Sequence, residues 1–419
     1  MKVAVIGAGI IGITTAYELA VDGHEVTVFE RRSTAAEETS FANAGVIAPG
    51  YVTPWAAPGM PGKVLSYLFR RHGPVKISLP LSGSELAWMW KWYQSCKLET
   101  YMRNRARMQR LALYSRQRLD CLTEDLALEY DRSQGYLVLL RTEKDSRMVQ
   151  SGLQLLRESG VSFSELNADE VRAIEPAINP EMQFMGGINL FDDGAANCRQ
   201  FALLLKNHAQ RMGVKFIFNT SVASVKYTPS ATIFIANESV PHTFDHVVMC
   251  AGLSSAALLK PLGLKIPMAA VYGYSISAPI GEPLNAPRSA LMDERYKVAI
   301  TRLGNRVRVA GSAEMGGILA SKRASSIRTL YKVLHDWFPA AAQHATLGVH
   351  VQEWKGARPM LPDGPPIIGS SGLPGLWLNL GHGSSGWALS CGSARAVADL
   401  VAGRAAEIDM EGLGISRLG

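Results

Sequence analysis

The alternation of apolar and polar positions is clearest near the start of the chain. An apolar run at residues 3–6 predicts a strand buried on both faces, and a helical pattern follows over residues 14–20. Asp22 and Gly23 mark a turn, after which a second apolar run leads to Glu30. The segment therefore predicts a strand, a glycine-rich turn, a helix and a second strand that ends at an acidic residue.

The glycine-rich turn has the spacing of a dinucleotide-binding fingerprint, with Gly7, Gly9 and Gly12 in the pattern GxGxxG. Gly7 allows a tight turn, Gly9 leaves room for a pyrophosphate at the helix N-terminus, and Gly12 permits close packing of helix on strand. Glu30 is placed to accept hydrogen bonds from a ribose diol, and its charge would repel a 2′-phosphate. The alternative is a glycine-rich turn that only connects a strand to a helix and binds no nucleotide. The flanking strand, helix and acidic residue disfavour it.

Later parts of the chain alternate between helical and strand patterns. Helices are predicted within residues 84–130, 143–159, 201–212 and 387–401, and strands at 135–140, 214–218 and 245–252. Residues 271–276 and 296–310 alternate in the manner of antiparallel strands, and residues 49–59 are too rich in Pro and Gly for regular structure.

These patterns predict an α/β fold of two interleaved domains. Residues 1–50, 142–262 and 348–419 carry the nucleotide-type elements and are assigned to a discontinuous Rossmann-like domain. Residues 51–141 and 263–347 are assigned to an α+β domain built on an antiparallel sheet. A binding site is expected where the two domains meet.

Composition excludes several classes of protein. The chain has 419 residues, of which 47% are hydrophobic and 19% are charged, as is typical of a globular protein. Its five cysteines are scattered without a C-x-x-C pair, which disfavours disulfides, zinc and iron–sulfur clusters, and no metal site is expected. No apolar run reaches membrane-spanning length and no signal peptide is evident, so a cytoplasmic location is expected. The net charge of +7 suits acidic substrates or an anionic surface but decides nothing alone, and no nucleic-acid partner is expected.

Four patterns together point to one family. They are the N-terminal fingerprint with Glu30, Cys250-Ala251-Gly252 at the end of a strand, Gly356-Ala357-Arg358-Pro359 running on to Pro362-Asp363-Gly364, and the glycine-rich segment Gly381–Trp387. On these motifs the chain resembles the FAD-dependent amino-acid oxidoreductases of the glycine oxidase and D-amino-acid oxidase type. Within that family, residues 39–45, 54–59 and 296–302 are most similar to the bacterial D-amino-acid dehydrogenases.

The resemblance implies a cofactor and a reaction. Non-covalent FAD would bind in the Rossmann-like domain, and the second domain would bind an amino-acid substrate. A hydride would pass from Cα to flavin N5, and the resulting imino acid would hydrolyse to a 2-oxo acid and ammonia. The electrons would pass to a membrane quinone or another carrier. A cyclic imino-acid dehydrogenase, an oxygen-using oxidase and a non-catalytic FAD-binding subunit stay open as alternatives.

The resemblance also implies a substrate site. Arg358 would pair bidentately with the substrate carboxylate, a geometry that guanidinium matches and lysine does not; the alternative is a surface arginine in a turn before Pro359. Four further residues are candidates for substrate contact or pocket closure, and for each a structural role is an equal alternative. They are Tyr272 and Tyr274, two apart on a predicted strand, together with Tyr51 and His382.

Residues expected at the cofactor come from seven segments. They are Gly7, Ala8, Gly9, Ile10, Ile11 and Gly12; Glu30 and Arg31; Ser40, Asn43, Ala44 and Gly45; Val222, Ala251 and Gly252; and Gly356, Gly383, Ser384, Ser385 and Gly386. Arg31 is equally consistent with a solvated surface arginine. Cys391, one turn into the last helix, is interpreted as a buried thiol and not as a covalent tether.

Peripheral contact with the inner face of the membrane is a further expectation. Residues 65–72 and 88–97 mix aromatic with basic side chains, a composition that suits an anionic membrane surface. The alternative, in which Trp88, Trp90 and Trp92 pack within the second domain, is favoured slightly by the residues themselves.

Overall fold

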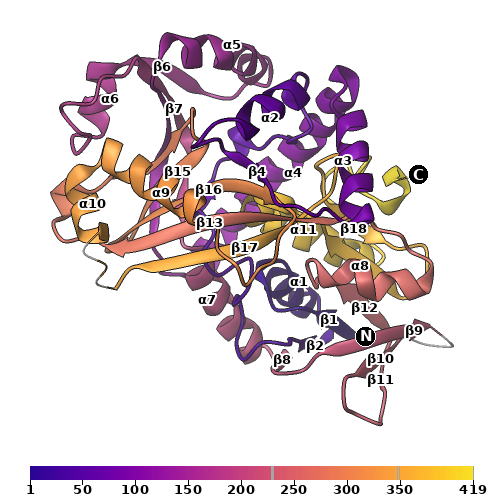
Figure 1. Ribbon diagram of the computed structural model, residues 1–419. Helices are drawn as coiled ribbons and strands as arrows, with labels where there is room; N and C mark the ends of the chain where they lie inside the picture. The colour runs from indigo at the N-terminus through magenta and orange to yellow at the C-terminus, as the bar shows by residue number, and fades with distance from the viewer. Residues whose placement is uncertain (228–230, 347, 349, 419) are drawn as a thin grey trace.

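A computed structural model describes residues 1–227, 231–346, 348 and 350–418 of the chain. Two large sheets dominate it. Figure 1 shows β13, β16 and β17 of one sheet running to the left, with β1, β2, β8 and β12 of the other below and to the right.

The first sheet has six strands in the order β18-β19-β12-β1-β2-β8. Their bounds are β1 (Lys2–Ile6), β2 (Glu25–Phe29), β8 (Lys215–Ile217), β12 (His246–Met249), β18 (Ile367–Ser370) and β19 (Leu376–Leu380). Neighbouring strands are parallel except for β18, which runs antiparallel to β19. All but the first residue of β1 and of β2 are buried, which explains why both strands read as continuous apolar runs.

Four helices share a hydrophobic core beside this sheet: α1 (Ile10–Val21), α4 (Leu98–Asp125), α7 (Cys198–Arg211) and α11 (Gly386–Val401). Small residues let α11 approach α4 closely. A Cβ on Gly392 would lie 2.8 Å from the backbone nitrogen of Ser115. A second cluster packs the sheet against α8 (Ser254–Leu259) and a three-stranded sheet of β9 (Val222–Tyr227), β10 (Ala231–Ile235) and β11 (His242–Phe244).

The second sheet has ten strands, and most of its neighbours are antiparallel. They are β3 (Val46–Ile47), β4 (Val75–Ile77), β5 (Arg132–Leu140), β6 (Phe163–Asn167), β7 (Gly186–Ala196), β13 (Ala269–Pro279), β14 (Ala290–Asp293), β15 (Val298–Leu303), β16 (Arg306–Met315) and β17 (Gln352–Met360). The main path is β17-β13-β16-β15-β14-β5-β7-β3, with β4 added to β16 and β6 to β7.

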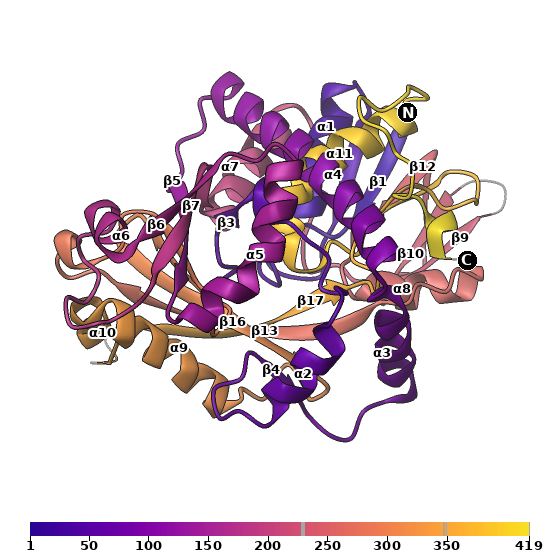
Figure 2. The same ribbon diagram turned by 90° about the horizontal axis from the view of Figure 1, so that it is seen from above.

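The remaining helices lie around the second sheet. They are α2 (Met60–Leu68), α3 (Gly83–Ser95), α5 (Glu143–Glu158), α6 (Ala168–Ile174), α9 (Ala324–Trp337) and α10 (Pro339–Thr346). Short 3-10 turns occur at Pro49–Tyr51, Lys260–Leu262, Pro283–Asn285, Gly383–Ser385 and Ile415–Leu418. Figure 2 shows α2 and α3 at the lower edge of the molecule, well away from α1 and β1.

The predicted fold class is confirmed: a parallel, Rossmann-like sheet is interleaved with a mostly antiparallel one. The domain division stays a prediction, but three of its ranges contribute strands to both sheets. To the ten-stranded sheet, residues 1–50 supply β3, residues 142–262 supply β6 and β7, and residues 348–419 supply β17. Alternating strands and helices on the sequence do not show which sheet a given strand joins, because that depends on pairing over long separations.

The turn between β1 and α1 generates a first prediction. A Cβ on Gly12 would lie 1.8 Å from the carbonyl oxygen of Gly7, so Gly12→Ala must push α1 away from β1. We expect the variant to lose roughly 1–3 kcal/mol of stability or more, measured as a lower thermal midpoint.

Gly152→Ala is the matched control for that experiment. Gly152 also lies inside a helix, but a Cβ there would meet no atom within 4 Å. Its alanine variant is expected to gain about 0.5–1 kcal/mol. Equal midpoints for Gly12→Ala and the parent protein would contradict the close packing of α1 on β1.

Candidate functional site

A cavity of about 330 Å³ opens beside the carboxyl ends of β1, β2, β12 and β19. Parallel α/β sheets commonly bind their ligands at this edge. Most of the residues predicted at the cofactor line it: Gly7, Gly9, Ile10, Ile11, Glu30, Arg31, Ser40, Val222, Ala251, Gly252, Gly383 and Gly386. His382 and Pro359 also contribute to the wall.

The N-terminus of α1 faces this cavity and fits the pyrophosphate of FAD. Gly9 is its N-cap and offers no side chain, and the nearest atom to a Cβ built there is Ser40 Oγ at 3.5 Å. The Ile10 N–H donates to the same Ser40 oxygen at 3.0 Å. Backbone donors at a helix N-terminus, with the helix dipole behind them, favour an anion. Gly7 has φ +105, and a Cβ there would lie 2.7 Å from the Cys250 carbonyl oxygen.

Acidic and basic side chains form the wall at the end of β2. The Glu30 carboxylate is held by the N–H groups of Ala8 at 2.7 Å and Arg32 at 2.8 Å. Arg31 donates to both oxygens of Glu38 at 2.8 and 2.6 Å, and to Ser254 Oγ at 3.1 Å. Arg31 is therefore fixed at the cavity wall, and Glu30 is oriented to accept further hydrogen bonds.

Other residues predicted at the cofactor lie outside the cavity wall. The two glycine-rich turns of the cavity include Ala8, Gly12, Ser384 and Ser385. Gly356 is covered by the Trp354 side chain, because a Cβ built on Gly356 would lie 1.6 Å from Trp354 Cη2. The segment 43–45 crosses the ten-stranded sheet: Asn43 Oδ1 accepts from Gly45 N at 2.9 Å, and the Ala44 carbonyl accepts from Thr301 Oγ1 at 2.9 Å.

His382 is a neutral, buried wall residue. Burial lowers the pKa of its imidazole to about 3, and its Nε2 lies 3.0 Å from Ser393 Oγ. His382 therefore lines the cavity and also makes a structural hydrogen bond, so the two interpretations of this histidine are compatible. Cys391 is a free thiol in the core that α1, α4 and α11 share, and it is absent from the cavity wall.

Arg358 lies on β17, next to the cavity-lining Pro359. Its Nη1 donates to the Ser312 carbonyl at 3.0 Å, and its guanidinium carbon lies 5.6 Å from the centre of a Trp55 ring. It forms no ion pair with a carboxylate of the described residues. Burial lowers its pKa to about 10, so it stays charged at neutral pH. The residue nevertheless keeps some exposed surface.

Two backbone features set the position of this guanidinium. A Cβ on Gly273 of β13 would lie 2.3 Å from Arg358 Nη2, so the guanidinium occupies the space that a side chain would fill. Opposite, the pairing of β13 with β16 shifts register between Tyr272 and Tyr274, and Ser312 in the bulge has φ +61. A bulge changes the direction of backbone groups locally, and here the Ser312 carbonyl in the bulge accepts the hydrogen bond from Arg358. Neither Gly273 nor Ser312 was predicted from the sequence, because neither belongs to a recognised motif.

The neighbouring Lys355 contrasts with Arg358 because its charge is neutralised. Its ammonium pairs with Glu314 at 3.1 Å and donates to the carbonyls of Ile318 and Ser321, each at 2.8 Å. Burial opposes ionisation of Glu314, but its hydrogen bonds to Ser78, Tyr274 and Lys355 lower its pKa overall. The Lys355–Glu314 ion pair was not predicted from the sequence either, because neither residue belongs to a motif.

The three predicted tyrosines have different surroundings. The Lys355 ammonium lies 4.3 Å from the Tyr272 ring centre and 5.4 Å from that of Tyr274, so both flank the Arg358 strand. The Tyr274 hydroxyl donates to Glu314, whereas that of Tyr272 makes no hydrogen bond to a described residue. Tyr51 lies elsewhere: its hydroxyl donates to Glu294 at 2.8 Å, and no contact joins it to Arg358 or the cavity wall.

Comparison with known proteins identifies the family. Residues 2–400 match the family model DAO, described as FAD dependent oxidoreductase. The chain belongs to this family. It is an FAD-dependent oxidoreductase, and the fingerprint cavity is the part of its structure that suits the cofactor.

Relatives match over their whole length. A protein of Cereibacter sphaeroides named D-amino acid dehydrogenase is 42% identical over 422 residues, which cover 100% of this chain and 95% of the relative. A protein of the same name from Bradyrhizobium diazoefficiens is 40% identical over 419 residues, covering 100% of this chain and 99% of the relative.

Solved structures of more distant proteins share the fold. Glycine oxidase from Geobacillus kaustophilus superposes with a TM-score of 0.77 at 21% identity, over 99% of each chain. L-proline dehydrogenase from P. horikoshii gives a TM-score of 0.72 at 16% identity, over 100% of this chain and 97% of that one.

The space above Gly273 generates a second prediction. In Gly273→Ala the new Cβ displaces the Arg358 guanidinium, so simple carboxylates such as acetate should bind at least tenfold more weakly, while FAD stays bound. Perturbation of the flavin absorbance during an acetate titration measures this affinity. Gly62→Ala, where a Cβ would meet no atom within 4 Å, is the matched control. Equal acetate affinity in all three proteins would show that Arg358 does not bind the anion.

Proposed function

We propose that this chain is a D-amino-acid dehydrogenase, which oxidises a D-amino acid to its imino acid. The full-length relatives of that name support the substrate class. The observation that carries the proposal is the partly buried guanidinium of Arg358, which lies beside the cofactor cavity without a carboxylate partner among the described residues. A substrate α-carboxylate supplies the missing negative charge.

Arg358 binds and orients the substrate. A guanidinium has donors in a planar fork that matches the two oxygens of a carboxylate. One of its nitrogens is already held by Ser312, and Gly273 and Trp55 bound its faces, so the remaining donors have a fixed direction. Trp55 also keeps water from the ion pair, which strengthens the attraction.

The α-amine of the substrate must be neutral before Cα can be oxidised. No described side chain near Arg358 is a free general base, because Lys355 is paired with Glu314 and His382 is bonded to Ser393. The positive charge of Arg358 instead lowers the pKa of the substrate ammonium, since a nearby like charge disfavours the charged form. Bulk water then accepts the proton.

Bound FAD supplies the oxidising equivalent by accepting a hydride from the substrate Cα. The residues of the chain orient that C–H bond: Arg358 fixes the carboxylate, and the cavity wall at Pro359 and His382 fixes the boundary between substrate and cofactor. The imino acid product then hydrolyses in water to a 2-oxo acid and ammonia.

The electron acceptor is proposed to be a quinone in a membrane that the α2–α3 surface contacts. We define this surface as the exposed apolar residues Leu65, Phe69, Leu86, Trp90 and Tyr93, of which Phe69 is 84% exposed. The exposed basic residues Lys63, Arg70, Arg71, Lys91 and Lys97 lie among them. Apolar side chains flanked by basic ones suit the interface of an anionic membrane.

Two further observations bear on this surface. Among the helices of the described residues, none combines the length and apolarity needed to cross a membrane. Trp88 and Trp92 pack against the cluster that contains Met360, and Trp88 Nε1 donates to the Met360 carbonyl at 2.9 Å. Trp90 instead points outward with 60% exposure. Trp88 and Trp92 therefore pack within the protein, and Trp90 is the tryptophan that we propose contacts the membrane.

Arg358→Lys provides the third prediction. Lysine keeps the charge but loses the fork, so the substrate affinity should fall roughly 10- to 100-fold, as expected from about 1.5–3 kcal/mol for one charged hydrogen bond. FAD should stay bound, because Arg358 lies outside the cavity wall. Anaerobic bleaching of the flavin by D-alanine measures the affinity, and unchanged bleaching would remove the carboxylate assignment.

The same anaerobic assay separates the alternative functions. Bleaching by D-amino acids supports the proposal, and bleaching by proline or hydroxyproline alone would make the protein a cyclic imino-acid dehydrogenase. Failure of every amino and imino acid to bleach the flavin would favour a non-catalytic FAD-binding subunit. Stoichiometric peroxide under air would make the protein an oxidase.

The α2–α3 surface gives the fourth prediction. Vesicles that contain phosphatidylglycerol should carry the protein upward in a flotation assay, and neutral vesicles should carry much less. The double variant Phe69→Ser, Trp90→Ser should float at least fivefold less. Phe191→Ser, which alters an exposed phenylalanine on β7, is the matched control. Equal flotation of both variants would place membrane contact elsewhere.

A further inference from the structure

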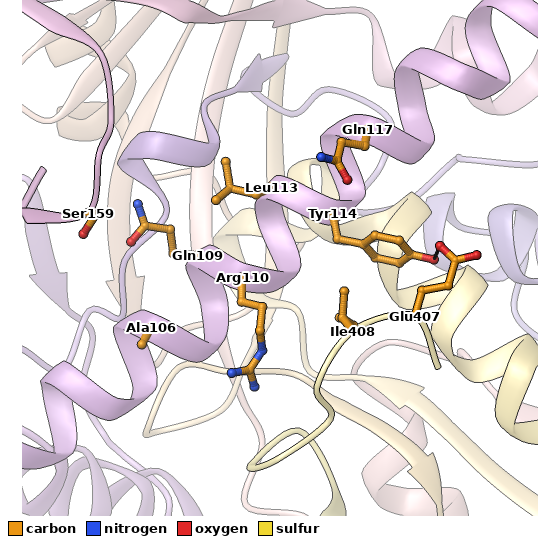
Figure 3. Close-up of a pocket in the computed structure, with 9 residues that line it drawn as sticks. All are labelled: Ala106, Gln109, Arg110, Leu113, Tyr114, Gln117, Ser159, Glu407 and Ile408. Carbon is orange, nitrogen blue, oxygen red and sulfur yellow. Dashed lines mark hydrogen bonds between the residues drawn. The ribbon is translucent and has the colours of Figure 1, made fainter. Parts of the chain in front are cut away.

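A second hollow of about 570 Å³ lies on the outer face of α4 (Figure 3). Its floor is α4 itself. One wall is Ser159, at the end of α5, and the other is residues 407–408 from the C-terminal segment. The opposite face of α4 packs in the core with α1 and α11, so the hollow and the cofactor cavity share no lining residue.

Arg105, a buried arginine that contacts the lining residue Ser159, lacks a counter-ion among the described residues. Arg105 is only 6% exposed, yet it forms no ion pair with a described carboxylate. Its one hydrogen bond runs from Nη1 to Ser159 Oγ at 3.5 Å. Arginine is almost never this buried unless it is paired, because an unpaired charge is costly to remove from water.

Two neighbouring donors are also unsatisfied. Gln109 follows Arg105 by one helical turn on the same face of α4, and Figure 3 shows its amide directed towards Ser159. Gln109 is 8% exposed, and its buried Nε2 has no hydrogen-bond partner among the described residues. Arg110 Nε is likewise buried and unpartnered. An orphaned buried donor is destabilising, and a ligand with acceptor oxygens would satisfy it.

The charges around the hollow limit where an anion can bind. Arg110 is already paired with Asp409 at 3.0 Å, and Glu407 accepts from the Tyr114 hydroxyl at 2.9 Å on the far wall. The carboxylate of Glu407 repels an anion from that end. The Gln109 end has no carboxylate among its lining residues. The unpartnered Gln109 Nε2 is a donor there, and Arg105 contacts Ser159, whose own hydroxyl already donates to the Leu155 carbonyl at 2.7 Å.

We infer that the hollow binds a small oxyanion, carboxylate or phosphate, at its Gln109 end. Its oxygens accept from the Arg105 guanidinium and the Gln109 amide, while the C-terminal segment closes the other side. The site is separate from the amino-acid site and does not depend on the proposed function.

The test is an equilibrium titration of the FAD-loaded protein with inorganic phosphate, and separately with acetate, against chloride at equal ionic strength. Both are run in an Arg358→Met background, which removes the guanidinium of the proposed substrate pocket. Calorimetry is expected to show one saturable site for at least one of the two anions. Gln109→Leu should weaken that binding at least fivefold, and Arg105→Gln at least tenfold.

Gln117→Leu is the matched control, because Gln117 lines the same hollow on α4 but is exposed, and it should leave the dissociation constant unchanged. Gln109→Leu replaces an unsatisfied polar group by an apolar one, so it tests the inference even if Arg105→Gln does not fold. Saturation by neither anion, or equal affinity in Gln109→Leu and the background protein, would overturn the inference.

Discussion

The unneutralised charge of Arg358 is the constraint on which the substrate half of the molecule depends. Burying a cation without a partner costs several kcal/mol, and such a cost persists only where the surroundings fix the group or a ligand offsets it. Here Gly273 leaves room for the guanidinium, and the Ser312 bulge gives it a single acceptor. Glu314, the nearest buried acid on β16, is occupied by Lys355 and Tyr274 and so leaves Arg358 free for a substrate.

The two sheets bring this charge to the cofactor. Arg358 belongs to β17, at one edge of the ten-stranded sheet, but the next residue, Pro359, already lines the cavity of the parallel sheet. Met360 then forms an isolated bridge with His382, at the glycine-rich turn before α11. The edge position suits Pro359, which has no N–H to give to a further strand. The strand that carries Arg358, the residue proposed to bind the carboxylate, is therefore joined directly to the wall of the cofactor cavity.

Most of the cofactor residues predicted from local signals line one cavity of the structure. The spacing of Gly7, Gly9 and Gly12 specifies one turn, and a single turn can be interpreted without knowing the rest of the fold. The surroundings of Arg358 depend on pairing across long separations, so Gly273, Ser312 and the Lys355–Glu314 pair carried no recognisable signal. Tyr51 shows the same limit: its aromatic character indicated a pocket, but its partner Glu294 lies 243 residues away in the sequence. The residue type of Tyr51 could not distinguish a position in a substrate pocket from a hydrogen bond to a buried glutamate.

The most direct test of the role of Arg358 compares D-alanine with D-alaninamide, in which the carboxylate is replaced by a neutral amide. The measurement is kcat/KM for anaerobic dye reduction by each substrate, in the parent protein and in Arg358→Met. If Arg358 binds the carboxylate, the parent protein prefers D-alanine strongly, and the preference falls to near one in the variant because both substrates lose the same partner. An undiminished preference for D-alanine in Arg358→Met would contradict the account.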